Sequence, residues 1–145
     1  MATMQTDLEK QTREIYAAVN AHDIEKFASF HTDDVVVENV ATGVVARGIG
    51  EEARATLKSA FAAIPDYKLE LISYFASGNR QCEEFVVSGT HMGDYMGIPA
   101  TGKKFSYRAV LVRELRGGKT CRVTTYSDSA TLMRQLGVLP PLSQK

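Results

Sequence analysis

The sequence predicts an α+β domain in which N-terminal helices pack in a curved antiparallel β-sheet and a short helix ends the chain. Three segments with helical spacing of apolar residues come first, before residue 65. A run of β-rich segments with glycine-containing turns then continues to residue 126. Helices followed by strands are typical of an α+β layer. A sheet that curls over helices leaves a cone with a mouth, and such places favour small-molecule pockets.

The 145 residues are expected to form one domain, spanning 1–145, with about residues 1–5 and 140–145 frayed. Polar caps mark helix starts, with Thr6 or Asp7 before the first helix and Asp23 before the second. The expected helices cover residues 7–21, 24–30, 51–63 and 129–136, and the expected strands cover residues 33–39, 44–47, 67–76, 81–92, 105–115 and 120–126.

Charge and composition argue against several classes of protein. Seventeen basic residues balance 17 acidic ones, so the basic surface expected of a nucleic-acid binder is not indicated. Two cysteines, Cys82 and Cys121, and three scattered histidines form no spaced set of metal ligands, and we expect neither metal nor cofactor. The N-terminus is polar, and no segment approaches the roughly 20 apolar residues of a membrane span. We therefore expect a cytoplasmic protein with free thiols.

A glycine-rich loop over residues 90–104, THMGDYMGIPATGKK, separates two of the predicted strands. His91 at its start is the best candidate for an acid/base group, because the ordinary pKa of histidine lies near neutrality. The alternative is that its imidazole ties the loop to a neighbouring backbone group. Met92 and Met96 give the loop an apolar side, which either covers a ligand as a lid or packs on the sheet rim or another subunit.

Several segments resemble the SnoaL-like branch of the NTF2-like superfamily, which includes polyketide cyclases. These are GTHMGDYMGIPATGKKF, the later GGK and DSATLMRQLG, together with VNAHDIEKFASFHTDDVVVEN and AAIPDY nearer the N-terminus. The resemblance covers nearly the whole chain. It implies an NTF2-like cone that binds a small hydrophobic or partly polar ligand, and a homodimer formed through the open face of the sheet.

The resemblance does not extend to the family's catalytic groups. In its polyketide cyclases an aspartate on the last strand is the acid/base, and a histidine on the preceding strand lies near the ligand. Those positions fall on Thr125 and Leu111 here. Threonine has no carboxylate to exchange a proton near neutral pH, so the cyclase mechanism does not carry over at these positions.

Ketosteroid isomerases resemble the front of the chain, in AAVNA and DDVVVEN. Their base aspartate falls on Asn39 and their oxyanion tyrosine on Ile15. Tyr16 is one position away, which turns it by about 100° on a helix. The resemblance therefore disfavours this chemistry too.

Other polar residues are candidates for lining the cone. Asn39 and Thr125 are expected to face it, where they bind a ligand carbonyl or hydroxyl or serve as polar lining without a chemical role. Tyr107 shares strand parity with Leu111, so it offers a phenol or a packing surface on the same face.

Five further charged or titratable groups have simpler interpretations. Glu83 and Glu84 are adjacent in a strand, so at most one of them contacts the pocket. Asp128 is expected to cap the last helix. His22 and His31 are expected at helix ends, in contact with solvent.

Three functional hypotheses follow, and the sequence leaves open whether the chain is an enzyme. The first is a cofactor-independent cyclase or isomerase that acts on a polyketide-like or terpenoid-like substrate, with His91 as acid or base. The second is a non-catalytic ligand-binding domain, because both family catalytic positions are lost. The third is an epoxide hydrolase or dehydratase. Epoxide hydrolysis needs two carboxylates around an arginine inside the cone. The alternation of side chains along the predicted strands does not bring such a set of residues together on the inner face.

Overall fold

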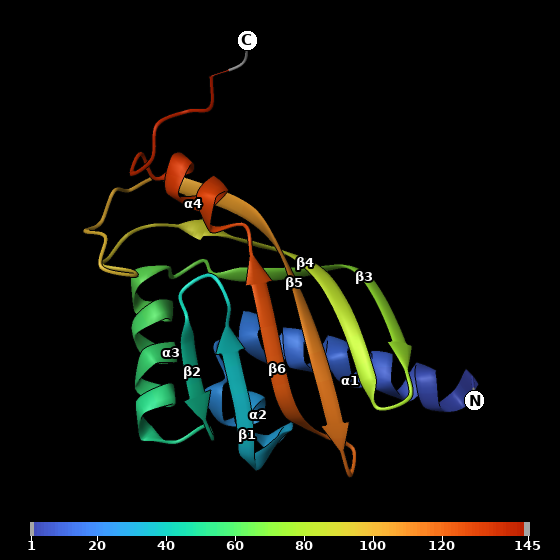
Figure 1. Cartoon of the computed structure of the whole chain (residues 1–145). Coiled ribbons are helices and arrows are strands. Elements are labelled where there is room, and N and C mark those ends of the chain that lie inside the picture. Colours follow the sequence, from blue (N-terminus) through green and yellow to red (C-terminus); the bar gives the residue numbers. More distant parts are fainter. Residues whose placement is uncertain (1, 144–145) are drawn as a thin grey trace.

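The computed structural model describes residues 2–143, with side chains from residue 7 onward, and it confirms the α+β prediction (Figure 1). The helices are α1 (Ala2–Asn20), α2 (Ile24–Ser29), α3 (Glu51–Ala63) and α4 (Ser129–Gln135). The strands are β1 (His31–Asn39), β2 (Val44–Arg47), β3 (Lys68–Ser77), β4 (Arg80–Thr90), β5 (Lys104–Arg116) and β6 (Lys119–Ser127). Among residues 2–143, no helix is long and apolar enough to cross a membrane.

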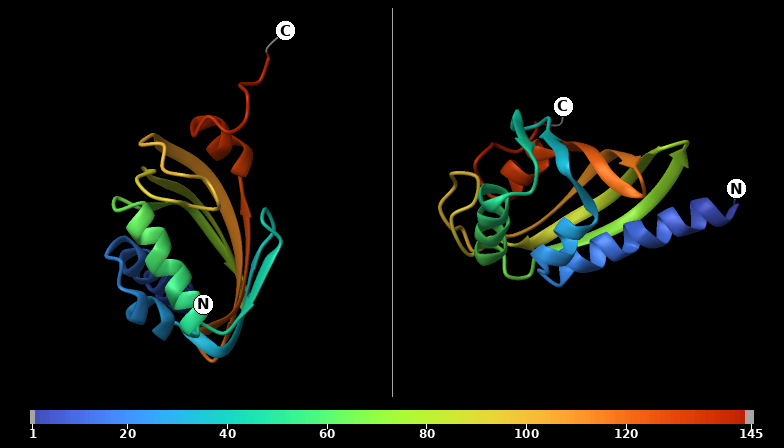
Figure 2. Two further views of the ribbon diagram at one scale, coloured as in Figure 1. Left: turned by 90° about the vertical axis from the view of Figure 1, so that its left-hand side faces the viewer. Right: turned by 90° about the horizontal axis from the view of Figure 1, so that it is seen from below.

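The six strands form one sheet in the order β2-β1-β6-β5-β4-β3. Strands β3 to β6 form the expected antiparallel meander. Strand β1 instead joins the free edge of β6 in parallel, and β2 pairs back on β1 as a hairpin. The sheet is strongly curved, and α1, α2 and α3 lie on its concave side, as Figure 2 shows.

The core fills the space between the helices and the concave face of the sheet. Alternate residues of β4 and β5 point into it, because successive side chains of a strand face opposite sides. Helix α1 contributes the buried Ile15 and Tyr16, and α4 contributes Leu132. The apolar residues of the strands in this core are Phe85, Val87, Phe105, Ala109, Leu111 and Val123.

Most element ends lie within two residues of the predictions, and the start of α1 differs most. Helix α1 begins at Ala2, before the predicted cap, because no glycine or proline interrupts the preceding residues. Residues 2–5, expected to be frayed, thus belong to α1, and residues 140–143 have no regular structure. The same expectation for residues 1, 144 and 145 lies outside the described part of the chain. The cap predicted at Asp128 is confirmed, since its carboxylate accepts the Thr131 N–H at 3.2 Å.

The glycine-rich loop is a shaped structure that contains its own small hairpin. Tyr95 and Ile98 exchange two backbone hydrogen bonds, of 3.0 and 2.9 Å. Between them, Met96 has φ 53° and Gly97 has φ 76°. Positive φ at both central residues is typical of a type I′ turn, which favours glycine.

Main-chain bonds fix both ends of this loop. The N–H groups of Met92 and Gly93 donate to the carbonyl of Ala63, at the end of α3. The His91 N–H donates to the Lys103 carbonyl, which closes the base of the loop. A side chain at Gly93 would place a Cβ only 3.0 Å from the Ala63 Cα, so this close contact favours glycine.

Candidate functional site

The concave face of the sheet carries two polar clusters with an apolar belt between them. One cluster surrounds Glu83, near the start of β4, and we call it the closed end. The other surrounds His91, just after β4 at the start of the glycine-rich loop, and we call it the mouth. At about 3.3 Å per residue, the strand between these residues spans at most about 26 Å. The belt between them includes Ile64, Phe85, Val87, Phe105, Ala109, Leu111 and Val123.

A fully buried ion pair forms the centre of the closed end. Glu83 has no exposed surface and the Arg113 side chain is 3% exposed. The Arg113 Nε donates to Glu83 Oε2 at 2.8 Å, and Nη2 donates to Oε1 at 3.2 Å. A third donor, Nη1, reaches the Thr120 hydroxyl at 3.0 Å. This two-point geometry fixes both charged groups.

Neutral side chains from other elements complete this cluster. Gln81 donates from Nε2 to Glu83 Oε2 at 3.0 Å and to the Thr12 hydroxyl of α1 at 2.7 Å. The Tyr74 hydroxyl of β3 donates to Gln81 Oε1 at 3.3 Å. The cluster therefore links α1 with strands β3 to β6.

Tyr16 faces this cluster, and its hydroxyl, which makes no hydrogen bond of regular geometry among the described residues, interacts with the Glu83 carboxylate. The residue is 6% exposed, and its ring meets Phe85 edge to face at 5.7 Å. Burial, followed by the nearby Glu83 carboxylate, raises the pKa of the Tyr16 phenol above its usual range. Tyr16 thus points toward the sheet together with its neighbour Ile15, which is 2% exposed.

The prediction that His31 lies in solvent is wrong. The residue is 6% exposed, and its Nδ1 lies 2.8 Å from the Phe27 carbonyl of α2. The parallel pairing of β1 with β6 brings it beside Arg113. Burial, and then the charge of Arg113, lower the pKa of His31 to about 4.

The mouth is organised around His91, which has no exposed surface. Its Nδ1 lies 2.9 Å from the Thr101 hydroxyl, across the base of the glycine-rich loop. Its Nε2 is buried and has no hydrogen-bond partner within residues 7–143. The imidazole therefore ties the loop together, as the alternative interpretation expects, although through a side chain. The other ring nitrogen makes no hydrogen bond with residues 7–143.

Three tyrosines lie near one another at this end of the cone. Burial raises the pKa of the Tyr67 and Tyr95 phenols. The nearby Tyr95 phenol is a second, smaller cause of the raised pKa of Tyr67. Burial, followed by these two phenols, raises the pKa of Tyr107. The Tyr95 ring also meets His91 edge to face, at 6.5 Å. All three hydroxyls therefore remain protonated near neutral pH, as hydrogen-bond donors.

Four positions singled out from the sequence lie in one row across the sheet. Asn39 of β1 is opposite Thr125 of β6, Thr125 is opposite Leu111 of β5, and Leu111 is opposite Glu83 of β4. Asn39 and Thr125 are partly exposed, Leu111 is 8% exposed, and Glu83 is fully buried. The row thus runs from solvent toward the closed end. The Asn39 side-chain oxygen already accepts N–H bonds in the β1–β2 turn, from Ala41 at 3.1 Å and Thr42 at 3.4 Å.

The remaining predicted residues lie around the mouth. Tyr107 packs against the core cluster from the same strand as Leu111. Met92 and Met96 are 59% and 42% exposed, while Tyr95 and Ile98 of the same loop pack on the core. The structure therefore separates the loop into an inward apolar side and an outward pair of methionines.

Sequence reasoning identified Glu83 only in part and missed its partners. The prediction that Glu83 and Glu84 face opposite sides is confirmed, because the Glu84 side chain is 38% exposed. Strand parity with Leu111 was a usable signal for Arg113, which points into the cone. Nothing local indicated Gln81 or Thr12, because their contact joins residues far apart in the chain.

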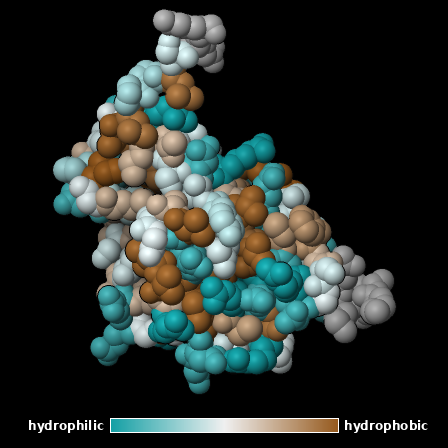
Figure 3. All heavy atoms as spheres, viewed as in Figure 1, coloured by the Kyte–Doolittle hydropathy of each residue, from teal (hydrophilic) through white to brown (hydrophobic). Residues whose placement is uncertain are grey.

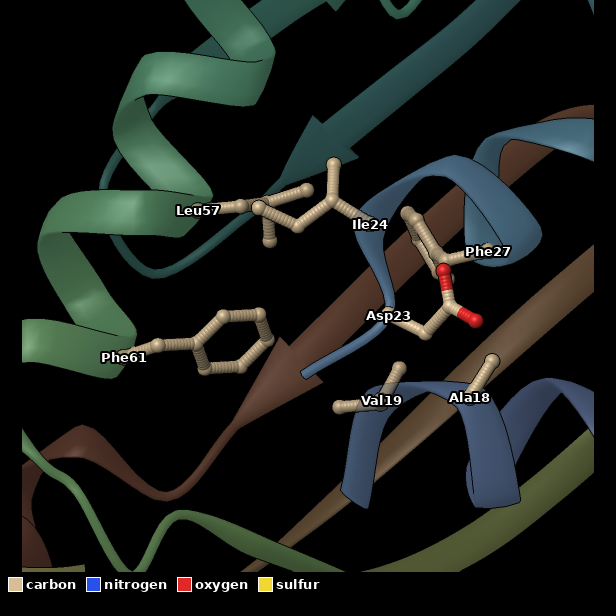
Figure 4. A pocket seen from close by; sticks show the side chains of 7 residues that line it. All are labelled: Ala18, Val19, Asp23, Ile24, Phe27, Leu57 and Phe61. Atoms are coloured by element: carbon tan, nitrogen blue, oxygen red, sulfur yellow. The ribbon is translucent and has the colours of Figure 1, made fainter. Parts of the chain in front are cut away.

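The cavities differ in size and position. Figure 4 shows a pocket between α1, α2 and α3 of ≈ 10 Å³, about the size of one water, lined by residues such as Ile24, Leu57 and Phe61. Two larger open grooves have volumes of ≈ 340 Å³, beside His31 and Arg54, and ≈ 330 Å³, beside His22 and Asp66. Within residues 2–143, no group of three or more potential ligands is placed to hold a metal ion.

Comparison with known proteins identifies the family to which this domain belongs. The model of the SnoaL-like polyketide cyclase family matches residues 10–136, so the chain belongs to that family. A search of curated proteins finds no match. Three solved structures share the fold, each over most of the chain.

AclR, a proposed hydroxylase from Streptomyces galilaeus, is 23% identical in sequence to this chain, with a TM-score of 0.83. The alignment covers 97% of this chain and 87% of AclR. TsrD from Streptomyces laurentii is 26% identical with a TM-score of 0.82, covering 92% and 97%. IdmH, a proposed polyketide cyclase from Streptomyces antibioticus, is 24% identical with a TM-score of 0.76, covering 90% and 99%.

Proposed function

We propose that this protein is a cofactor-independent enzyme of the cyclase or isomerase type. It folds a polyketide-like or terpenoid-like substrate against the apolar belt and moves protons with His91. The observation that carries the proposal is the buried Nε2 of His91, which has no hydrogen-bond partner among residues 7–143 and lies beside a cone lined mainly by apolar side chains. Membership of the SnoaL-like family supports this type of role.

The surroundings of His91 suit a proton carrier. When Nδ1–H donates to the Thr101 hydroxyl oxygen, Nε2 presents a lone pair toward the substrate. It accepts a proton from a substrate carbon or hydroxyl, and the resulting imidazolium returns that proton to a substrate oxygen. The Thr101 oxygen also accepts the Lys103 N–H at 3.3 Å, which holds it in place for both steps.

The other predicted residues take binding roles in this proposal. Thr125 and the amide of Asn39 bind substrate oxygens on the solvent side of the cone. Tyr16 and Tyr107 border the interior of the cone. Leu111 shapes the apolar wall, and Met92 and Met96 cover the mouth when a ligand is bound.

The outer face of the sheet is the proposed dimer surface. Figure 3 shows hydrophobic residues among hydrophilic ones on this face. Phe75 and Tyr126 are 63% and 52% exposed there. The mass in solution tests this assignment, and cell fractionation tests the proposed cytoplasmic location.

Activity of a His91 variant tests the catalytic proposal. Wild type and His91→Gln are incubated with a panel of linear polyketide-like and terpenoid-like precursors, and products are separated by chromatography and mass spectrometry. We expect His91→Gln to lower kcat by roughly 10²- to 10⁴-fold with a smaller change in KM, as for loss of an acid/base group. Lys58→Gln, at an exposed position of α3, serves as the control. An unchanged kcat at saturation would exclude His91 as the proton carrier.

A second candidate is a ligand-binding domain without chemistry, favoured by Leu111 and Thr125 at the family's catalytic positions. Ligands recovered chemically unchanged from the same incubations would support it. Epoxide hydrolysis is favoured less, because Arg113 is paired with one carboxylate, Glu83, among the described residues.

A further inference from the structure

We infer that Asp66 is a positioning residue for His91. Residues 63–66 join α3 to β3, and we call them the clamp because they hold the chain on both sides of the histidine. Asp66 is exposed, so it acts on the imidazole through the backbone and not by contact with a substrate in the cone. The inference rests on the proposed function, because it concerns the group that is proposed to move protons.

The first argument is the pair of bonds that Asp66 makes just before His91. Its Oδ1 accepts the Thr90 N–H at 2.7 Å, and its Oδ2 accepts the Thr90 hydroxyl at 2.7 Å. Hydrogen bonds to an ionised carboxylate are stronger than those between neutral groups. The bond from the Thr90 hydroxyl is the main cause that lowers the pKa of Asp66, so the carboxylate is ionised near neutral pH. Asp66 thus fixes the last residue of β4 at two points.

The second argument is that the clamp also holds the chain just after His91. The Met92 and Gly93 N–H groups donate to the Ala63 carbonyl, at 2.8 and 3.0 Å. Figure 1 shows the glycine-rich loop beside this end of α3. The His91 N–H donates in the other direction, to the Lys103 carbonyl at 2.9 Å. The histidine is therefore held between the clamp and the far limb of its own loop.

The third argument is that glycine occurs where the clamp comes closest to this stretch. A Cβ at Gly89 would overlap Ile64 Cγ2 and would lie 3.3 Å from Asp66 Oδ1. A Cβ at Gly93 would lie 3.0 Å from Ala63 Cα. Neither glycine has a positive φ, so the missing side chain serves the close approach and not a special backbone conformation. The two glycines let the clamp pack against both sides of the histidine.

The position of the imidazole matters for the proposed role, since displacing a reacting group by about 1 Å can cost roughly 10²-fold in rate. Within residues 7–143, Nε2 of His91 has no hydrogen-bond partner. The hydrogen bonds that hold the ring are therefore the one at Nδ1, with Thr101, and those of the adjoining backbone. Loss of Asp66 should let the end of β4 shift and should turn the ring away from Thr101.

Two variants of Asp66 and one matched control test this role. Asp66→Ala removes both bonds to Thr90. Asp66→Asn keeps the size of the side chain, an oxygen that accepts the N–H and an amide that donates to the hydroxyl. Asp128→Ala is the control, because Asp128 accepts the Thr131 N–H at 3.2 Å and the Thr131 hydroxyl at 2.6 Å. Both aspartates are exposed, so the two alanine variants lose the same kinds of bond at the surface.

NMR of the imidazole groups in the full chain, without substrate, is the first measurement. Long-range proton–nitrogen correlation spectra distinguish ring nitrogens that carry a proton from those that do not. We expect Asp66→Ala to shift the His91 ring nitrogens, because the contact with Thr101 loosens, and Asp66→Asn to give signals close to those of the wild type. Asp128→Ala should leave the His91 signals unchanged, and the His31 signals should stay the same in all variants.

Turnover of the precursors used for His91→Gln is the second measurement. Asp66→Ala should lower kcat roughly 10- to 100-fold and change KM less than about 2-fold, as for a displaced reacting group. Asp128→Ala should keep the kcat of the wild type.

His91 signals in Asp66→Ala that match the wild type would overturn the positioning role and leave the proposed function standing. Equal shifts in Asp66→Ala and Asp128→Ala would also overturn it, because they would reflect a general loss of stability. Shifted signals in Asp66→Ala alone, together with an unchanged kcat of His91→Gln, would contradict the proposed function but support the positioning of the imidazole by Asp66.

Discussion

The two polar ends of the cone are built by different kinds of interaction. The closed end is a cluster of side chains from five elements, centred on an ion pair with both partners at most 3% exposed. The mouth is one histidine held by one threonine, in a loop fixed mainly by main-chain bonds. The closed end thus depends on tertiary contacts between distant residues, whereas the mouth depends on a local loop. We expect substitutions to cost much more stability at the closed end.

The difference also bears on the proposed roles of the two ends. The proposed proton carrier, His91, lies in a loop that main-chain bonds fix at both ends. The Glu83–Arg113 pair is held by two hydrogen bonds of its own. The belt between the two ends gives shape without charge.

The largest expected effect is at the closed end, on Arg113→Met. Removing the guanidinium leaves the Glu83 carboxylate buried without its ion-pair partner, which should lower the free energy of unfolding by about 3–5 kcal/mol. Urea denaturation followed by circular dichroism measures this change.

The control comes from the same strand. Arg108 pairs with Glu84 at 3.5 Å on the outer face, with 71% of the arginine side chain exposed. Arg108→Met should therefore cost at most about 1 kcal/mol. The double variant Arg113→Met with Glu83→Leu should recover much of the lost stability. Equal losses for the two single arginine variants would show that the closed end is not the more tightly bound region.

The next effect is the pH dependence that His31 gives to the closed end. Its pKa in the folded protein is about 4, below the ordinary value of about 6.5 for unfolded histidine. The unfolded chain therefore binds the proton first, and stability falls as the pH drops from about 6.5 toward 4. The loss should approach about 3 kcal/mol at pH 4, and it is absent above about pH 6.5.

Urea denaturation at pH 7 and pH 4.5 measures this effect, with His31→Gln as the comparison. The difference between the two proteins removes the contribution of the carboxylates, which they share. A wild-type pH dependence equal to that of His31→Gln would mean that His31 is not held neutral by its surroundings.

Much of the fold was predictable because its signals are local. The alternation of residues in β3 to β5 and the turn residues between them define the meander. Strand parity separated Glu83 from Glu84, and the position of Asp128 before a helical segment identified a cap. Such features depend on a few adjacent residues, which a single sequence displays.

The closed end was not predictable because its contacts join residues far apart in the chain. The burial of His31 follows from the parallel pairing of β1 with β6, which no local pattern indicates. The direction of Tyr16 depends on how α1 is rotated against the sheet, and a comparison of aligned positions placed it facing away. Arg113 shares the parity of Leu111, yet a charged residue in a strand is ordinarily expected to face solvent.

The smallest effect concerns the mouth, on Thr101→Val. This change keeps the shape of the side chain but removes the oxygen beside His91 Nδ1, so both ring nitrogens would be buried without partners. We expect a loss of about 1–2 kcal/mol, well below that of Arg113→Met, because the main-chain bonds of the loop remain. Thr101→Ser keeps the hydroxyl and should lose less. The same denaturation measurement decides the comparison: a loss as large as that of Arg113→Met would mean that the mouth is as firmly held as the closed end.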